Sequence, residues 1–205
     1  MKTRILIMAL VSLALLLPGT VMAQQMFDFY GMAQVPSVEG ESLAMYGVVR
    51  DGSPTFTTPL PLDFLNYEYT LVVTDLVLDT DGNPQVYSGG MIAIYQDDAT
   101  LADYTNPGSF TDGLAILTGV FTNLNRWVFT STMGNAAGLV DWTGGNNIND
   151  IAPEDQTGWA FLSPINLSPT SVEPGYDEVW DGKVEPVYPI VDVENVTWDE
   201  LKALF

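Results

Sequence analysis

The chain has 205 residues, of which 26 are acidic and 6 are basic, and it contains neither histidine nor cysteine. The absence of these two residue types excludes Ser-His-Asp and Cys-His nucleophile systems, thiolate redox chemistry and His- or Cys-ligated zinc. The formal net charge of −20 predicts no nucleic-acid partner and no binding to an anionic membrane surface, because like charges repel.

The N-terminus has the pattern of a secretory signal peptide. Lys2 and Arg4 precede an apolar run from Ile5 to Leu17, and small residues precede a cleavage position after Ala23. We therefore expect residues 1–23 to be removed and the mature chain to be secreted, periplasmic or held at the cell surface. Because the removed segment carries two of the basic residues, the mature net charge becomes 4 − 26 = −22.

The first half of the mature chain is predicted to consist of strands. Alternating, β-branched and aromatic stretches indicate strands at Phe27–Tyr30, Leu43–Val49, Tyr67–Leu78 and Val86–Tyr95. The turn residues Asp79–Pro84 join the last two into a long hairpin. In the second of these two strands, Gly89-Gly90 indicates a bulge or a close backbone approach.

The second half is predicted to continue in the same way after a short helix between Asp97 and Tyr104. Further strands are expected at Leu114–Phe121, Arg126–Thr132, Gly138–Trp142, Gly158–Leu162 and Glu178–Val184, with a turn over residues 122–125. Short strands at regular spacing are typical of an all-β fold. We predict that residues 24–185 form one antiparallel β-sandwich or jelly roll.

The composition changes beyond Glu185, and residues 186–205 are interpreted as a linker and a short C-terminal helical tail. Thr197 and Glu200 form a capping-box pattern, and Trp198, Leu201 and Phe205 lie close to one helical face. So short a helix is marginal in water by itself. It is therefore expected to pack on its own domain or to serve in sorting or docking.

One group of oxygen-bearing side chains is a candidate calcium site. Asp75, Asp79, Asp81 and Asn83 lie in or near the hairpin turn, and carboxylate and amide oxygens are the ligands that Ca²⁺ prefers. The EF-hand pattern fails, because Gly82 falls at position 4 and Gly90 at position 12 when counted from Asp79. The alternative is an ordinary hairpin turn.

Two tryptophans with polar neighbours are candidates for a carbohydrate site. The 23 aromatic residues exceed what a sandwich core requires, so some are expected at the surface, where their rings can stack on sugars. The residues proposed for this ligand site are Trp142, Asn146, Asn147, Trp180 and Asp181. The alternative is that each tryptophan belongs to the core.

Several stretches between Tyr67 and Gly145 resemble exported β-rich bacterial proteins that have no assigned activity. The stretches are Tyr67–Val73, Tyr87–Gly90, Ile94–Asp97, Phe110–Gly113 and Asp141–Gly145. The resemblance implies an exported location and a β fold.

Together these features predict an exported, non-catalytic binding or surface-structural protein, with glycans or cell-surface components as candidate partners. No cofactor is expected apart from Ca²⁺. Two alternatives stay open, namely a carboxylate-dependent glycan-active enzyme and a self-assembling surface subunit. The first follows because carboxylates are the general acid/base groups that remain available.

Overall fold

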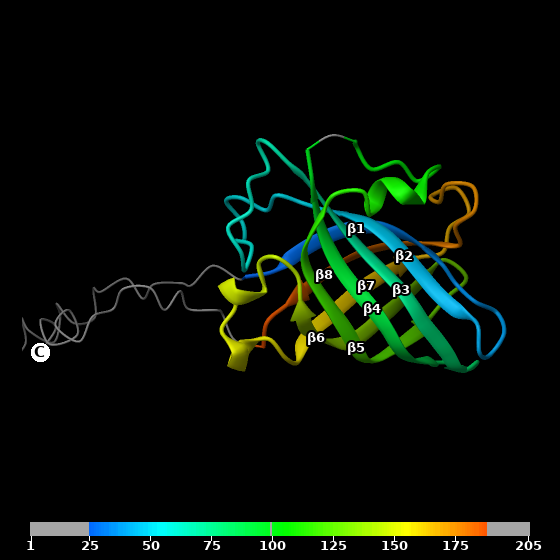
Figure 1. Cartoon of the computed structure of the whole chain (residues 1–205). Helices are drawn as coiled ribbons and strands as arrows, with labels where there is room; N and C mark the ends of the chain where they lie inside the picture. Colours follow the sequence, from blue (N-terminus) through cyan, green and yellow to red (C-terminus); the bar gives the residue numbers. More distant parts are fainter. Residues whose placement is uncertain (1–24, 99, 188–205) are drawn as a thin grey trace, which may run out of the picture.

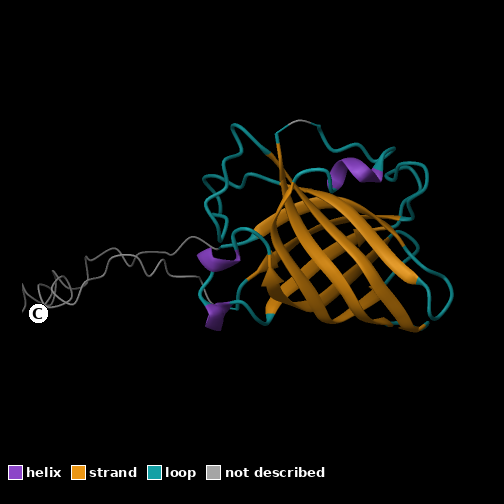
Figure 2. Ribbon diagram, viewed as in Figure 1, coloured by secondary structure: helices purple, strands orange, loops and turns teal. Residues whose placement is uncertain are grey.

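The computed structural model describes residues 25–98 and 100–187, and these form a closed barrel of antiparallel strands (Figures 1 and 2). Each strand pairs with its neighbours in chain order, and the last strand pairs with the first. The strands are β1 (Phe27–Gln34), β2 (Ser42–Val49), β3 (Glu68–Thr80), β4 (Gln85–Asp97), β5 (Leu114–Val128), β6 (Met133–Gly144), β7 (Trp159–Asn166) and β8 (Glu178–Glu185).

The prediction of a β-sandwich or jelly roll is wrong, although the all-β class is correct. Pairing of β1 with β8, from Phe27 opposite Val184 to Ala33 opposite Glu178, closes a single sheet on itself. A sandwich and a barrel both alternate buried and exposed residues along each strand, so the sequence pattern does not distinguish them. Closure depends on a pairing between strands at opposite ends of the chain.

Three short 3-10 helices, η1 (Pro107–Phe110), η2 (Ile148–Asp150) and η3 (Pro153–Asp155), are the helices of the described residues. No helix in this part of the chain is long and apolar enough to cross a membrane. The helix predicted between Asp97 and Tyr104 is wrong, because Asp97 ends β4 and the described residues that follow it form no helix before η1. The predicted signal peptide and C-terminal helical tail lie outside the described residues.

The long hairpin predicted from the sequence is confirmed as β3 and β4, but the predicted turn over residues 122–125 is wrong. That segment is part of the 15-residue strand β5, which pairs with both β4 and β6. The ladder between β5 and β6 shifts register between Phe121 and Asn123. The polar residues that suggested a turn therefore mark a bulge inside a strand.

Bulges at one level bend the longest strands. In a regular strand one outward-facing residue separates two buried ones. Here two residues separate the buried Val73 and Leu76 in β3, and two separate the buried Phe121 and Leu124 in β5. In β4, Gly89-Gly90 lies at the same level, and both residues have positive φ. A Cβ on Gly90 would lie 2.5 Å from the Leu76 side chain, so the predicted close approach is confirmed.

Large apolar side chains fill the inside of the barrel. Phe27 stacks on Trp159 with ring centroids 6.0 Å apart, and Phe29 stacks on Phe161 at 5.3 Å. Leu60 and Ile151, from the connections at one end, belong to the same buried cluster. Barrels of eight strands have an interior that side chains can fill, and this one is filled chiefly by aromatic and branched residues.

A second, smaller apolar cluster lies on the outer face of β1, β2 and β8. Met32 and Val179 point outward from the barrel and are covered by Tyr176, with Tyr46 and Tyr104 packed against them. The Tyr176 hydroxyl donates to the carbonyl of Tyr104 at 3.0 Å. The β4–β5 connection is thereby joined to the β7–β8 connection, which starts from the opposite end of the barrel.

Candidate ligand pocket at the barrel mouth

The two ends of the barrel differ in the length of their connections. One end carries residues 50–67, 98–113 and 145–158, while the other carries residues 35–41, 81–84, 129–132 and 167–177. β1 begins and β8 ends at the first of these, which we call the mouth. Binding residues are often found on long loops that a rigid scaffold positions, so the mouth is the first place to look for a site.

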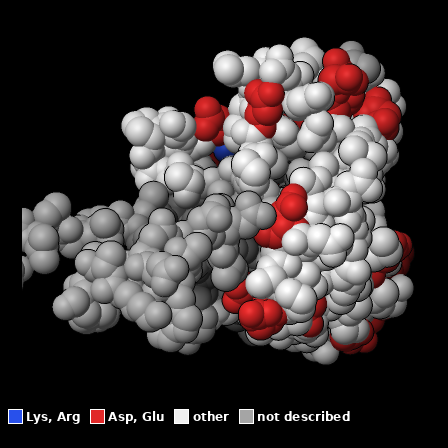
Figure 3. Space-filling model, turned by 60° about the vertical axis from the view of Figure 1, so that its left-hand side comes forward, with Lys and Arg blue, Asp and Glu red and all other residues white. Residues whose placement is uncertain are grey.

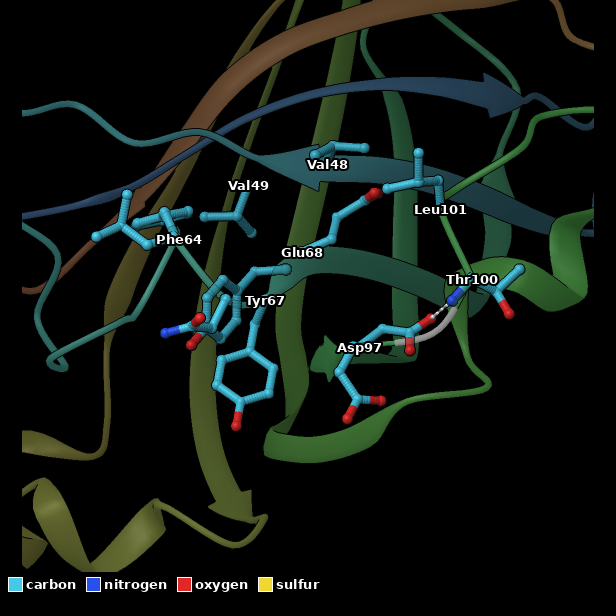
Figure 4. Close-up of a pocket in the computed structure, with 12 residues that line it drawn as sticks. Val48, Val49, Phe64, Tyr67, Glu68, Asp97, Thr100 and Leu101 are labelled. Carbon is cyan, nitrogen blue, oxygen red and sulfur yellow. Dashed lines mark hydrogen bonds between the residues drawn. The ribbon is translucent and has the colours of Figure 1, made fainter.

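A cavity of about 460 Å³ lies at the mouth between connections 50–67 and 98–113. Val49 and Tyr69, at the ends of β2 and β3, are buried residues of the barrel core and form its deepest wall. Phe64 packs on Tyr69 with ring centroids 5.1 Å apart. Val48 and Leu101 face each other across the upper part of the cavity in Figure 4. The walls are thus largely apolar and aromatic.

Two carboxylates in the cavity wall hold the β4–β5 connection by accepting backbone hydrogen bonds. Glu68 accepts from the amide of Ala102 at 3.0 and 3.3 Å, and Asp97 accepts from the amide of Thr100 at 3.3 Å (Figure 4). These bonds fix the chain on both sides of the exposed side chain of Leu101. The wall that connection 98–113 supplies is therefore held in place before any ligand arrives.

Tyr69 joins the other connection to the barrel. Its hydroxyl accepts from the amide of Asp63 at 3.0 Å and lies 3.4 Å from Oε1 of Gln96, to which it donates. Burial raises the pKa of Tyr69, so its side chain is a neutral phenol at physiological pH. Tyr69 therefore serves as an anchor for residues 50–67 and as part of the apolar wall.

The cavity is acidic. Glu68, Asp97 and Asp98 line it, and no basic residue does. The three described basic residues all form ion pairs elsewhere: Arg50 with Asp28 and Asp181, Arg126 with Glu178, and Lys183 with Glu185. On the face shown in Figure 3, acidic groups far outnumber basic ones. The pocket therefore combines apolar and aromatic side chains with three acidic groups, of which Asp97 is buried and Asp98 is exposed.

No protein-family model, curated protein or solved structure matches this chain.

The structure does not bring the predicted carbohydrate-site residues together. Trp142 and Trp180 lie inside the barrel with 2% and 0% of their surface exposed, so neither ring offers a face to solvent. Asn146 is exposed and Asn147 bonds Asp150 at 2.8 Å in the β6–β7 connection. Asp181 lies on the outside of β8, paired with Arg50. None of these residues lines the mouth cavity.

The predicted calcium-site residues lie along the β3–β4 hairpin, at the opposite end from the mouth. Asp81 accepts from the side-chain amide of Gln85 at 2.9 Å, and Asn83 donates to the carbonyl of Val128 at 2.9 Å. Asp75 and Asp79 are exposed on β3. Within the described residues, no three His, Cys, Asp or Glu side chains are grouped so as to hold a metal ion. Calcium binding here stays a prediction.

Sequence reasoning missed the mouth cavity and a polar cluster buried inside the barrel. The cluster centres on Arg126, which donates to Gln85 at 2.8 Å and to Glu178. The indole of Trp180 donates to the second Glu178 oxygen at 2.8 Å. In the sequence, the polar cluster is marked only by Arg126 within a predicted strand, and the cavity only by the run Tyr67-Glu68-Tyr69. Neither pattern indicates which residues from other strands or loops lie beside it.

Proposed function

We propose that this chain is an exported, non-catalytic binding protein that holds a small organic ligand in the cavity at the barrel mouth. The observation that carries the proposal is the cavity of about 460 Å³ with an apolar and aromatic base and a few polar groups. Small-molecule sites typically have volumes of about 300–1,000 Å³, are mostly apolar, and recur in the mouths of β-barrels.

The roles of the polar groups support binding in preference to catalysis. Glu68 and Asp97 accept hydrogen bonds from backbone amides, and the Tyr69 hydroxyl bonds Asp63 and Gln96. These interactions shape the walls and leave the groups in stable pairings. A general acid or base needs a pKa close to the working pH, and burial moves the pKa of Tyr69 further above that range.

The proposal is tested by filling the cavity. The variant Val48→Trp places a large ring over the pocket from a half-buried position on β2. The matched control is Val120→Trp, at a position on the outer surface of β5 that is 40% exposed. Binding is measured from the fluorescence of the neutral apolar probe N-phenyl-1-naphthylamine. We expect the native chain and Val120→Trp to bind it, and Val48→Trp to lose most of the binding while keeping its β-sheet circular dichroism.

Two outcomes contradict the proposal. If native protein and both variants bind the probe equally, the probe binds elsewhere and the cavity is not the site. If the folded native chain binds no probe of this size, the cavity does not accept small organic molecules.

A further inference from the structure

We infer that the mouth cavity is selective for an organic cation, meaning a ligand with an ammonium group attached to an apolar body. This inference rests on the proposed function and adds the chemical class of the ligand. It follows from the combination of apolar and aromatic side chains with three acidic side chains in the wall of one cavity.

The charges of the cavity select against an anion. Glu68, Asp97 and Asp98 line it without a basic residue. Arg50, Arg126 and Lys183, the basic residues of the described chain, are all held in ion pairs with acids. A carboxylate or phosphate ligand would therefore lose its hydration and gain no counter-charge, whereas an ammonium group would be attracted.

The aromatic side chains favour an ammonium group over a metal ion. Phe64, Tyr67 and Tyr69 form a linked set, with ring centroids of Phe64 and Tyr69 at 5.1 Å and of Tyr67 and Tyr69 at 6.5 Å. Tyr67 is half-exposed and lines the cavity, and in Figure 4 its ring and the Glu68 carboxylate point in opposite directions. Aromatic faces attract organic cations, while Ca²⁺ takes about six to eight oxygen ligands that this wall does not supply.

The apolar part of the ligand is expected to lie deeper than the charged part. Val49 is a core residue and packs at the base of the cavity, whereas Asp98 and Leu101 are exposed at the rim. Solvent-exposed carboxylates by themselves bind a cation weakly, because water screens the attraction between the charges. An apolar body buried against Val49 holds the ammonium group close to the carboxylates of the cavity wall.

The test compares three ligands of similar shape by isothermal titration calorimetry: 2-phenylethylammonium, 2-phenylethanol and 3-phenylpropanoate. We expect the ammonium compound to bind at least about tenfold more tightly than the alcohol, which corresponds to about 1.4 kcal/mol. Added sodium chloride should reduce that ratio, because salt screens the more exposed of the cavity charges, above all that of Asp98. The carboxylate should show no binding.

Charge-neutral variants separate the pocket from the overall field of an acidic protein. Glu68→Gln keeps an oxygen for the Ala102 amide, and Asp98→Asn changes an exposed rim residue. Both should lower ammonium affinity by a larger factor than alcohol affinity. The matched control is Glu173→Gln, an exposed acid in the connection at the opposite end, which changes the net charge equally.

The outcomes distinguish the two proposals. Equal affinities for ammonium and alcohol would overturn the cation inference and leave the binding function standing. An equal loss of ammonium affinity in Glu173→Gln would overturn it as well, since the overall field would then be the cause. If none of the three ligands binds and N-phenyl-1-naphthylamine also fails, the proposed function falls with it.

Discussion

Arg126 in β5 donates a hydrogen bond to Glu178 in β8, and both side chains lie buried inside the barrel. Arg126 also donates to Gln85, and Trp180 donates to Glu178, so the pair forms a polar centre within an apolar interior. Two buried charges are costly to remove from water and depend on each other to remain there.

Removing one partner of the buried pair should strongly destabilise the barrel. We expect Arg126→Met to lower the free energy of unfolding in urea by about 3–5 kcal/mol, because Glu178 would be left buried and unpaired. The double variant Arg126→Met with Glu178→Leu should recover much of that loss. Lys183→Met, which breaks the more exposed pair with Glu185, is the control and should cost less than about 1 kcal/mol. A single variant as stable as the native chain would contradict the assignment of a buried charge pair.

Gly182 should not tolerate a side chain. A Cβ at this position in β8 would lie 2.5 Å from the carbonyl oxygen of Leu162 and 2.9 Å from the ring of Phe29. We expect Gly182→Ala to cost about 1–3 kcal/mol of stability in the same urea experiment, because the interior has to shift to accept it. Gly108→Ala is the matched control, since its Cβ would meet nothing closer than 3.4 Å. Equal effects of the two variants would show that the inside of β8 is loosely packed.

The barrel should lose stability at high pH. Burial raises the pKa of Tyr87 and of Tyr104 above the ordinary value of 10.0. Above pH 10 the unfolded chain therefore releases these phenolic protons while the folded chain keeps them, so the free energy of unfolding falls as pH rises further. We expect it to be nearly independent of these groups between pH 7 and about 9. Tyr104→Phe should make the decline above pH 10 less steep.

The absorbance of tyrosinate provides the check. In the folded chain, part of the tyrosine signal should appear only at a pH well above that of the urea-unfolded chain. Identical titration curves for the folded and unfolded chain would contradict the burial of these hydroxyls.

The outer cluster should influence the cavity from a distance. Tyr176 contacts Tyr104 with ring centroids 5.7 Å apart and bonds its carbonyl, and Tyr104 lies in the connection that carries Thr100 and Leu101. We expect Tyr176→Ala to weaken N-phenyl-1-naphthylamine binding several-fold by loosening that wall. Tyr176→Phe keeps the ring and should have a much smaller effect. Undiminished binding in Tyr176→Ala would show that the wall is held by Glu68 and Asp97 alone.

Much of the strand content follows from the sequence because it is a local property. The alternation in Tyr67–Leu78 and the turn residues after it predict the β3–β4 hairpin correctly. The closure of the barrel does not follow from the sequence. β1 and β8 are separated by most of the chain, and the local sequence of neither strand indicates which strand it pairs with. The polar residues 122–125 misled for a related reason, because a bulge and a turn use the same residue types.

The candidate site was less predictable than the fold. The aromatic content suggested exposed rings at Trp142 and Trp180. A closed barrel needs large side chains to fill its interior, and both tryptophans are buried there. The mouth cavity combines Phe64, Glu68 and Leu101, from two connections and one strand end that only the folded chain brings together. The Arg126–Glu178 pair spans 52 positions and has no local pattern at all.

The pairing of β1 with β8 also determines how this barrel can meet another protein. An open sheet ends in strands whose free amides and carbonyls can recruit a strand from another chain, which is a common route to both recognition and aggregation. Here every strand has neighbours on both sides, so the described barrel offers no such template. A partner of the barrel therefore has to be recognised through side chains and loops, because no barrel strand of the described residues offers a free edge.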